Sequence, residues 1–519
     1  MRLLVLLWFL LLASAQARPR FVLLPLDNRP CNLLFVRQIG RIAQSEVVTP
    51  PVHLLGNYLE PGQPEALAEW LKHQLRPGDQ LLLSSDMLCF GGLVASRQAA
   101  TSLEQARQRL KLLEELRPYH VEVLATLPRL SLRTSDEQAP FERALHDWAT
   151  REDSPAPADV PPQWVREYIG VRARNLEVLK ELIRATLDGR IERLVIGQDD
   201  SHRSGLHKRE QLRLLELRDS LGLEKRVMLL SGADELSMNM LAGRLSDLYD
   251  VHPEIALEYS EAGSERRIPP LESHPLATTV EQHLLLGGAH PGDPGDPSLL
   301  RLFIQVPAAR PYQLPEASEA PRSYALVERV REWMDQGRAA ALADLAYINR
   351  MDPHLARAVI DRLDLVELEG FAAWNTPANA LGTVVAQVVV REIAHRQAEH
   401  WKPAEIRESA RTHLAFLLAR LIDDYGYQTM VRTELIPETH GLPLQPDPLL
   451  SPYIRLGAKV RQRLLGWAEE LYRGHFLGRV VRLPGGGKCR LGPMKLEAIL
   501  PWPRLFEVEV RLDLVLEDC

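Results

Sequence analysis

Short apolar runs alternate with longer amphipathic segments along most of the chain. Eight runs rich in Val, Leu and Ile predict strands at residues 21–26, 80–84, 121–126, 193–197, 226–231, 255–259, 302–306 and 365–368, with weaker candidates at 47–55 and 342–348. Between them, apolar positions at helical spacing predict helices, among them 102–116, 164–187, 207–221 and 324–336. Strands that alternate with helices are typical of an α/β protein built from βα units.

Eight strands is the number that a closed (β/α)8 barrel needs. We therefore expect a barrel-like catalytic domain over residues 18–385, a helical extension over 386–475 and a small C-terminal β unit over 476–519. The last unit contains predicted strands at 479–483 and 506–515. Two doubly wound α/β domains are the alternative. Two Pro-rich stretches, 153–162 and 287–298, predict surface loops.

Residues 1–17 predict a secretory signal peptide. A basic residue, Arg2, precedes an apolar run at residues 3–12, and Ala15-Gln16-Ala17 has the small-x-small form of a cleavage site. An uncleaved membrane anchor is less favoured, because a helix of this length, at roughly 1.5 Å per residue, spans about half of the hydrocarbon core. We expect an exported, soluble protein, periplasmic or extracellular, with no membrane span after signal cleavage.

Composition and charge limit the classes of molecule that the chain can bind. The chain has 519 residues, 45% of them apolar, which is ordinary for a globular protein. Its 62 Lys and Arg against 69 Asp and Glu give a formal charge of -7, and the basic residues form no long run. Nucleic-acid binding through a basic face is therefore disfavoured. The sequence does not indicate whether the protein is a monomer or an oligomer.

Four cysteines fall into two groups, Cys31 with Cys89 and Cys489 with Cys519. An exported compartment permits disulfides, and pairing within each group is the simplest of three connectivities. The cysteines show no CxxC or Cys/His ligand spacing, so a structural zinc site is not indicated.

Polar side chains follow most of the strong predicted strands, at the point where each strand ends. In chain order these candidate residues are Asp27, Asn28, Arg29, Asp86, Arg129, Gln198, Asp199, Asp200, His202, Asp234, Glu235, Trp374 and Asn375. Ligand sites of parallel α/β folds lie at the carboxyl ends of the strands. If the strands are parallel, we expect these residues to face one cleft.

Two acid pairs, Asp199-Asp200 and Asp234-Glu235, are the catalytic candidates. Crowding of two carboxyls raises the pKa of one, which leaves an acid and a base side by side. We assign the other candidates to substrate binding. The arginines would form hydrogen bonds with a carboxylate, phosphate or hydroxyl group, and Trp374 would stack on a sugar ring. Structural roles are the alternative, since Asp and Asn cap helices, arginines pair with nearby acids and tryptophans fill cores.

Three further matches are set aside. Asp199 and His202 fit no standard metal-ligand spacing, so no metal is assigned. Gly485-Gly486-Gly487-Lys488 lacks the strand–loop–helix context of a phosphate loop and predicts a hairpin turn. The chain has no GxSxG elbow for a serine hydrolase mechanism.

Several motifs carry a resemblance to a known family. They are PLDNRPCN at 25–32, SSDMLCFGGLVASR at 84–97, GQDDSH at 197–202, GADE at 232–235, AAWNTPANALGT at 372–383 and PWPRLFEVE at 501–509. Together they resemble the bacterial family catalogued as domain of unknown function 4127. The resemblance implies one conserved unit over nearly the whole mature chain and assigns no activity.

The acid pairs favour an exported glycoside hydrolase acting on a cell-wall or extracellular glycan. Glycosidic cleavage needs one carboxyl to protonate the leaving oxygen and a second to act as base, nucleophile or charge stabiliser. The Asp199-Asp200 pair is loosely similar to the paired acids of hexosaminidases that use the acetamido group of the substrate. No cofactor is required. A metal-dependent hydrolase of phosphoesters or amides, or a non-catalytic glycan-binding protein, remains as an alternative.

Overall fold

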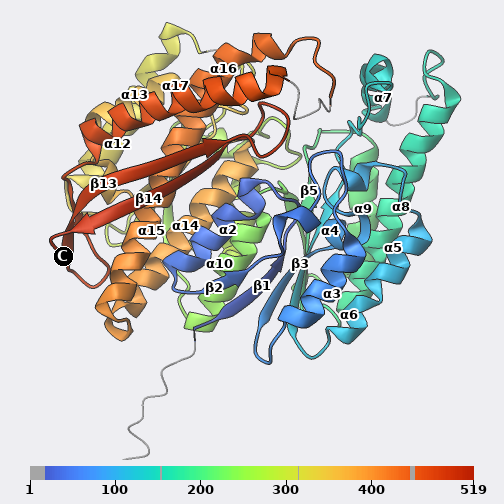
Figure 1. Ribbon diagram of the computed structural model, residues 1–519, viewed down its shortest axis with the longest axis horizontal. Coiled ribbons are helices and arrows are strands. Elements are labelled where there is room, and N and C mark those ends of the chain that lie inside the picture. The colour runs from blue at the N-terminus through green and yellow to red at the C-terminus, as the bar shows by residue number, and fades with distance from the viewer. Residues whose placement is uncertain (1–17, 152–154, 314, 445–450) are drawn as a thin grey trace, which may run out of the picture.

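The computed structural model describes residues 18–151, 155–313, 315–444 and 451–519. The predicted signal peptide lies outside them. The chain forms two parallel β-sheets that are separated by helices, and a small antiparallel sheet close to the C-terminus (Figure 1). In the described part of the chain, no helix is long and apolar enough to cross a membrane.

The first sheet has six parallel strands in the order β2-β1-β3-β4-β5-β6. Their bounds are β1 (Arg20–Leu24), β2 (Glu46–Val48), β3 (Gln80–Ser84), β4 (His120–Leu127), β5 (Arg193–Gln198) and β6 (Val227–Ser231). Strand β1 lies inside the sheet and β2 is added on one side of it, at the edge. Strands β3 to β6 are then added in sequence on the other side of β1. The order therefore reverses between β1 and β3, which is where ligands bind in doubly wound folds.

The second sheet repeats this order as β8-β7-β9-β10-β11, again parallel. Its strands are β7 (Glu254–Tyr259), β8 (His290–Pro291), β9 (Leu300–Gln305), β10 (Ala340–Asp344) and β11 (Gly370–Ala372). The corresponding reversal lies between β7 and β9.

The prediction of a (β/α)8 barrel is wrong. A closed barrel has no edge strands, whereas β2, β6, β8 and β11 are the edges of two open sheets. The alternative of two doubly wound α/β domains fits this arrangement. Helices that follow β6 and β11 are buried around most of their circumference, which suits a position between two sheets rather than the solvent-facing outer ring of a barrel.

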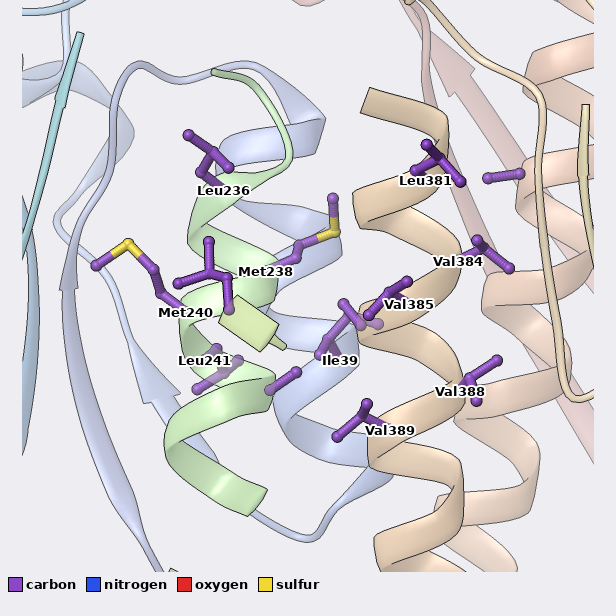
Figure 2. Packing of buried hydrophobic residues seen from close by; sticks show 14 of the residues in the cluster. Ile39, Leu236, Met238, Met240, Leu241, Leu381, Val384, Val385, Val388 and Val389 are labelled. Carbon is purple, nitrogen blue, oxygen red and sulfur yellow. The ribbon is translucent and has the colours of Figure 1, made fainter. Parts of the chain in front are cut away.

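Those helices form the central layer. The layer contains α2 (Leu34–Ile42), α10 (Leu236–Tyr249), α11 (Leu276–Leu286) and α14 (Pro377–Gln397). Figure 2 shows Met238 of α10 and Ile39 of α2 beside Val385 of α14, and Leu241 and Val389 belong to the same buried cluster. Burial of such aliphatic side chains is worth about 1.5–3 kcal/mol each, so this layer joins the two sheets into one core.

Side chains alternate between the central layer and the outer layers. In β1, Phe21 and Leu23 point to the central layer, while Val22 and Leu24 point to the outer face. The outer face of the first sheet is covered by α3 (Pro64–Gln74), α4 (Ser85–Phe90), α5 (Leu103–Leu110), α6 (Leu112–Glu115), α8 (Pro162–Leu187) and α9 (Leu206–Ser220). That of the second sheet is covered by α12 (Ala320–Met334), α13 (Pro353–Arg362) and α15 (Pro403–Leu421), while α17 (Ser451–His475) packs on the C-terminal sheet.

The C-terminal sheet consists of β12 (Val480–Arg482), β13 (Lys488–Ile499) and β14 (Glu509–Glu517). The Cys489–Cys519 disulfide forms in it as expected. The predicted Cys31–Cys89 bond is wrong, because both thiols are free and buried. Cys31 belongs to the central layer and Cys89 to the outer face of the first sheet, so the sheet separates them.

Two details of the strand prediction also fail. Residues 365–368 largely form a 3-10 helix, Leu365–Glu367, and the last strand of the second sheet follows it as β11. The long strand β13 was not predicted. The proposed division at residue 385 falls inside α14, while the division at 475 coincides with the end of α17.

Candidate functional site

Polar and charged side chains from both sheets meet beyond the carboxyl ends of the strands. Asp27 and Arg29 follow β1, Asp234 follows β6, and Asn375 follows β11 of the second sheet. The Arg29 guanidinium binds both oxygens of Asp234, with Nη2–Oδ1 at 2.6 Å and Nη1–Oδ2 at 3.0 Å. The Asn375 amide donates to Oδ2 of Asp234 at 3.1 Å, so the two sheets contact through this carboxylate.

Local backbone geometry sets the position of Arg29. Oδ1 of Asp27 accepts the backbone N–H of Arg29 at 3.0 Å and the side-chain amide of Asn32 at 2.8 Å. This is the turn that an aspartate promotes after a strand. Oδ2 of Asp27 accepts from Arg29 Nε at 2.9 Å, which leaves the guanidinium between Asp27 and Asp234. Burial alone would lower the pKa of Arg29, but these two carboxylates raise it.

A second cluster surrounds Arg129, beyond β4 and β5. Its Nη2 and Nε bind Asp199 at 2.6 and 2.9 Å, and its Nη1 binds Oδ2 of Asp200 at 2.7 Å. Arg97 adds a further bond to Oδ2 of Asp199 at 2.5 Å. Asp199 is therefore held between two guanidinium groups, whereas Asp200 contacts one.

Arg97 reaches this cluster because the chain turns back after α4. The Ser84 hydroxyl caps the start of α4, and Gly91 ends it at φ +90°. Gly92 follows at φ +126°, a conformation that favours glycine, and the N–H of Leu93 then donates to the carbonyl of Leu26 at the end of β1. The following 3-10 turn carries Arg97 to Asp199.

The two neighbouring aspartates differ in protonation. Burial would raise the pKa of Asp199, but Arg129 and Arg97 hold it well below its usual range. Burial raises the pKa of Asp200, and Arg129 only partly opposes this while the Asp199 charge adds to it. Asp200 also has a positive φ of 28°, and about a quarter of its side chain is exposed. Backbone strain of this kind costs about 1–3 kcal/mol and clusters at functional sites.

The two clusters interact. Arg29 contributes to the low pKa of Asp199, and burial together with the charges of Asp27 and Asp199 raises the pKa of Asp234 against the effect of Arg29. Three arginines thus face four carboxylates. The carboxyl with the fewest guanidinium contacts and the most exposure is Asp200.

Other predicted residues lie outside the two charge clusters. The Asp86 carboxylate is buried, accepts the N–H of Thr126 at 2.9 Å and has a pKa raised to about 7 by burial. Gln198 is buried and bonds to Gln211 and to the Leu127 carbonyl. Trp374 belongs to the central core, and only 6% of it is exposed. His202 is exposed next to Asp200 and Ser201.

Glu235 is fully buried and faces away from the charge clusters. Its Oε1 contacts Nε2 of His283 at 2.9 Å, and His283 Nδ1 bonds to the carbonyl of Thr279 at 2.8 Å. Burial raises the pKa of Glu235, against the effect of His283. Of the four predicted catalytic acids, Asp199, Asp200 and Asp234 therefore lie in the charge clusters and Glu235 lies in the core between α10 and α11.

Sequence reasoning missed the contribution of the C-terminal segment. The Trp502 indole N–H donates to Asn28, and its ring lies 5.1 Å from the guanidinium carbon of Arg29. Glu507 pairs with Arg504 and comes within 4.0 Å of Arg29. These C-terminal residues do not follow a strand of the parallel sheets, and neither does Arg97. The segments that contain them, 501–509 and 84–97, are nevertheless among the motifs quoted for the family resemblance.

A cleft of about 660 Å³ opens beside Asp200, between the carboxyl ends of the two sheets. Ser201 and Tyr312 line it, and the Asp200 charge, after burial, raises the pKa of Tyr312. The N–H of Ser201 bonds to the carbonyl of Leu271 across the sheets at 2.8 Å. Within the described residues, no group of three or more His, Cys, Asp or Glu side chains is arranged to hold a metal ion.

The family model described as "Protein of unknown function (DUF4127)" matches residues 21–511. The chain belongs to this family, as its motifs predicted. No curated protein and no solved structure matches it.

Proposed function

We propose that this chain is a glycoside hydrolase in which Asp200 is the general acid. The observation that carries the proposal is the pair of opposite pKa shifts on neighbouring carboxyls that share Arg129. Two titratable groups whose environments separate their pKa values supply an acid and an ionised carboxylate at one pH. Glycosidic cleavage requires that combination.

Asp200 has the features that a proton donor needs. Its raised pKa keeps the proton at a pH where an ordinary aspartate has lost it. Its side chain is about a quarter exposed, and the next residue, Ser201, lines the cleft, so a substrate bound there would lie near it. Asp199 stays ionised between Arg97 and Arg129, and its negative charge faces the positive charge that develops on the sugar ring. Asp234, whose pKa is also raised, is the candidate for the proton-accepting role.

The remaining polar groups bind substrate in this proposal. Arg29 and Asn375 both hold Asp234, and this hydrogen-bonded set can exchange partners with sugar hydroxyls. The Cys489–Cys519 disulfide supports an oxidising, exported setting for the reaction, since such bonds persist outside the cytosol.

The test is turnover of aryl glycosides and cell-wall oligosaccharides by the mature chain. Asp200→Asn should lower kcat by about 10²- to 10⁴-fold, which is the usual contribution of a general acid. Asp250→Asn is the matched control, because Asp250 is fully exposed and also has a positive φ of 53°. Activity that survives in Asp200→Asn, or that disappears with a chelator, would contradict the proposal.

A further inference from the structure

The cleft beside Asp200 lies at the point where the strand order of the second sheet reverses. Its walls come from the connections after β7 and after β9, at residues 264–276 and 306–312, and from residues 201–203 after β5. Ligands of doubly wound sheets bind outside the carboxyl ends of the strands at such a reversal. The cleft therefore has the position of a ligand site in its own right.

Its walls are basic, although the chain as a whole is acidic. Arg203, Arg266 and Arg267 line the cleft, and all three are exposed. Arg203 has no ion pair or hydrogen bond with any described residue of the chain, and Arg266 reaches only its neighbour Glu265, at 3.6 Å. Arg267 pairs with Glu261 at 3.1 Å, and its side chain remains mostly exposed, so an anion in the cleft would compete with Glu261 for it. The carboxyl in the cleft wall is Glu272, and burial raises its pKa to about 7. A local positive field in a protein of formal charge -7 selects for a negative ligand.

Two buried polar atoms in the cleft wall lack a partner. The Ser201 residue is 4% exposed and Glu272 is 2% exposed, yet Ser201 Oγ and Glu272 Oε1 make no hydrogen bond within the described part of the chain. Leaving such a group unsatisfied has a free-energy cost. The backbone next to them is strained, because Leu271 has a positive φ of 61°. A ligand that bonds to these atoms would recover that cost.

We propose that this cleft binds the anionic groups of an acidic glycan, a saccharide with carboxylate or sulfate substituents. The proposal rests on the glycan-cleaving function and names its substrate class. Arg203 and Arg267 bind the negative group, since a guanidinium pairs with carboxylate or sulfate oxygens through two parallel N–H bonds. The Ser201 hydroxyl donates a third bond, and the chain continues from there directly to Asp200.

The test compares acidic and neutral glycans of the same linkage. Uronic-acid oligomers with α-1,4, β-1,4 and β-1,3 linkages, and sulfated oligosaccharides, are titrated beside their carboxyl-reduced or desulfated counterparts. We expect at least one acidic probe to bind ten-fold or more tightly than its neutral counterpart, and raised salt to reduce the difference. The two sets of probes show whether carboxylate or sulfate is the recognised group.

Charge-matched variants localise the effect. The double variant Arg203→Gln, Arg267→Gln should abolish the preference for the acidic probe. Arg461→Gln with Arg473→Gln removes the same charge from exposed positions of α17 and should leave the preference intact. No preferred acidic probe, or a preference that survives in the cleft variant, would overturn the proposal.

The outcomes separate this inference from the proposed reaction. Acidic probes that bind at the arginines but are never cleaved would support the inference and contradict the glycosidase proposal. Neutral glycans that are cleaved through Asp200, with no preference for acidic ones, would do the reverse.

Discussion

Asp199 and Asp200 are adjacent in the chain, yet their carboxyls occupy different electrostatic environments. Two arginines neutralise Asp199, so its proton is lost at low pH. Asp200 contacts only one nitrogen of Arg129, Nη1. Burial and the Asp199 charge raise its pKa, so it keeps its proton to higher pH. The pair is tuned by what surrounds it, because the two side chains are chemically identical.

This difference predicts the pH dependence of kcat/KM. A general acid must be protonated, so activity should fall as pH rises through the Asp200 pKa, and this limb should lie above the ordinary aspartate value of about 3.9. Asp199 should remain ionised on the acidic side, because its pKa is lowered. In Arg129→Gln the cation that lowers the Asp200 pKa is lost, so the alkaline limb should move to higher pH. A limb that stays in place would argue against Asp200 as the acid.

For individual residues, the sequence indicates which positions can form a functional site, but not which side chains are accessible to a ligand. The acids after β5 and β6 could be found because polar residues at strand ends are visible in a single sequence. Arg97 could not, because a glycine turn carries it back to Asp199 from beyond the end of α4. Trp374 and Glu235 looked available in the sequence, and only the packing of the central layer shows that they are buried.

Helices α10 and α14 approach each other closely at Gly382. A Cβ atom there would lie 2.3 Å from Cγ of Glu235 and 2.5 Å from Oδ1 of Asn239, both on the segment that begins α10. Gly382→Ala should therefore lower the free energy of unfolding by about 1–3 kcal/mol, the usual cost of overpacking a core. The urea midpoint measures it.

Gly457→Ala in α17 is the matched control for that substitution. No atom lies within 4 Å of a Cβ at Gly457, so alanine should stabilise this helix by up to about 1 kcal/mol. Equal midpoints for the two variants would show that the helices can separate without cost, and that the central layer is not tightly packed.

Element types were largely predictable, because apolar period and turn residues are local signals. The prediction of β3 at 80–84 is confirmed residue for residue, and that of β5 at 193–197 within one residue. The failures are short or partly exposed strands. The strand β11 has three residues and follows a 3-10 turn of similar composition, and β13 alternates charged and apolar residues in the open C-terminal sheet.

Strand pairing over the whole molecule is not a local property, which is why a count of strands suggested a barrel. The available signal was the weak amphipathicity of the helices at 236–249 and 377–397, whose apolar residues occupy more than one face. A helix with apolar residues on more than one face has to be covered on more than one side, and two sheets with a shared helical layer achieve that. The same arrangement brings Asn375 of the second sheet to Asp234 of the first.

The C-terminal segment contacts the loop that follows the first strand. Trp502 bonds to Asn28 across 474 residues of sequence and packs on Tyr58 at 5.3 Å and on Arg29. Trp502→Ala should destabilise the protein by about 3–5 kcal/mol, as expected for loss of a buried indole. Hydrogen exchange should then accelerate at residues 20–32 as well as around residue 502, because both sides of the contact lose their partner.

Trp467→Ala tests whether this coupling is specific. Trp467 packs on Tyr425 and Gly426 within the outer layer of the second sheet, so its loss should accelerate exchange there and leave residues 20–32 protected. If Trp502→Ala accelerated hydrogen exchange only in the C-terminal segment, that segment would not stabilise the rest of the fold. If residues 20–32 respond, the C-terminal segment helps to hold Asn28 and Arg29 in place, and the site depends on chain ends as well as on both sheets.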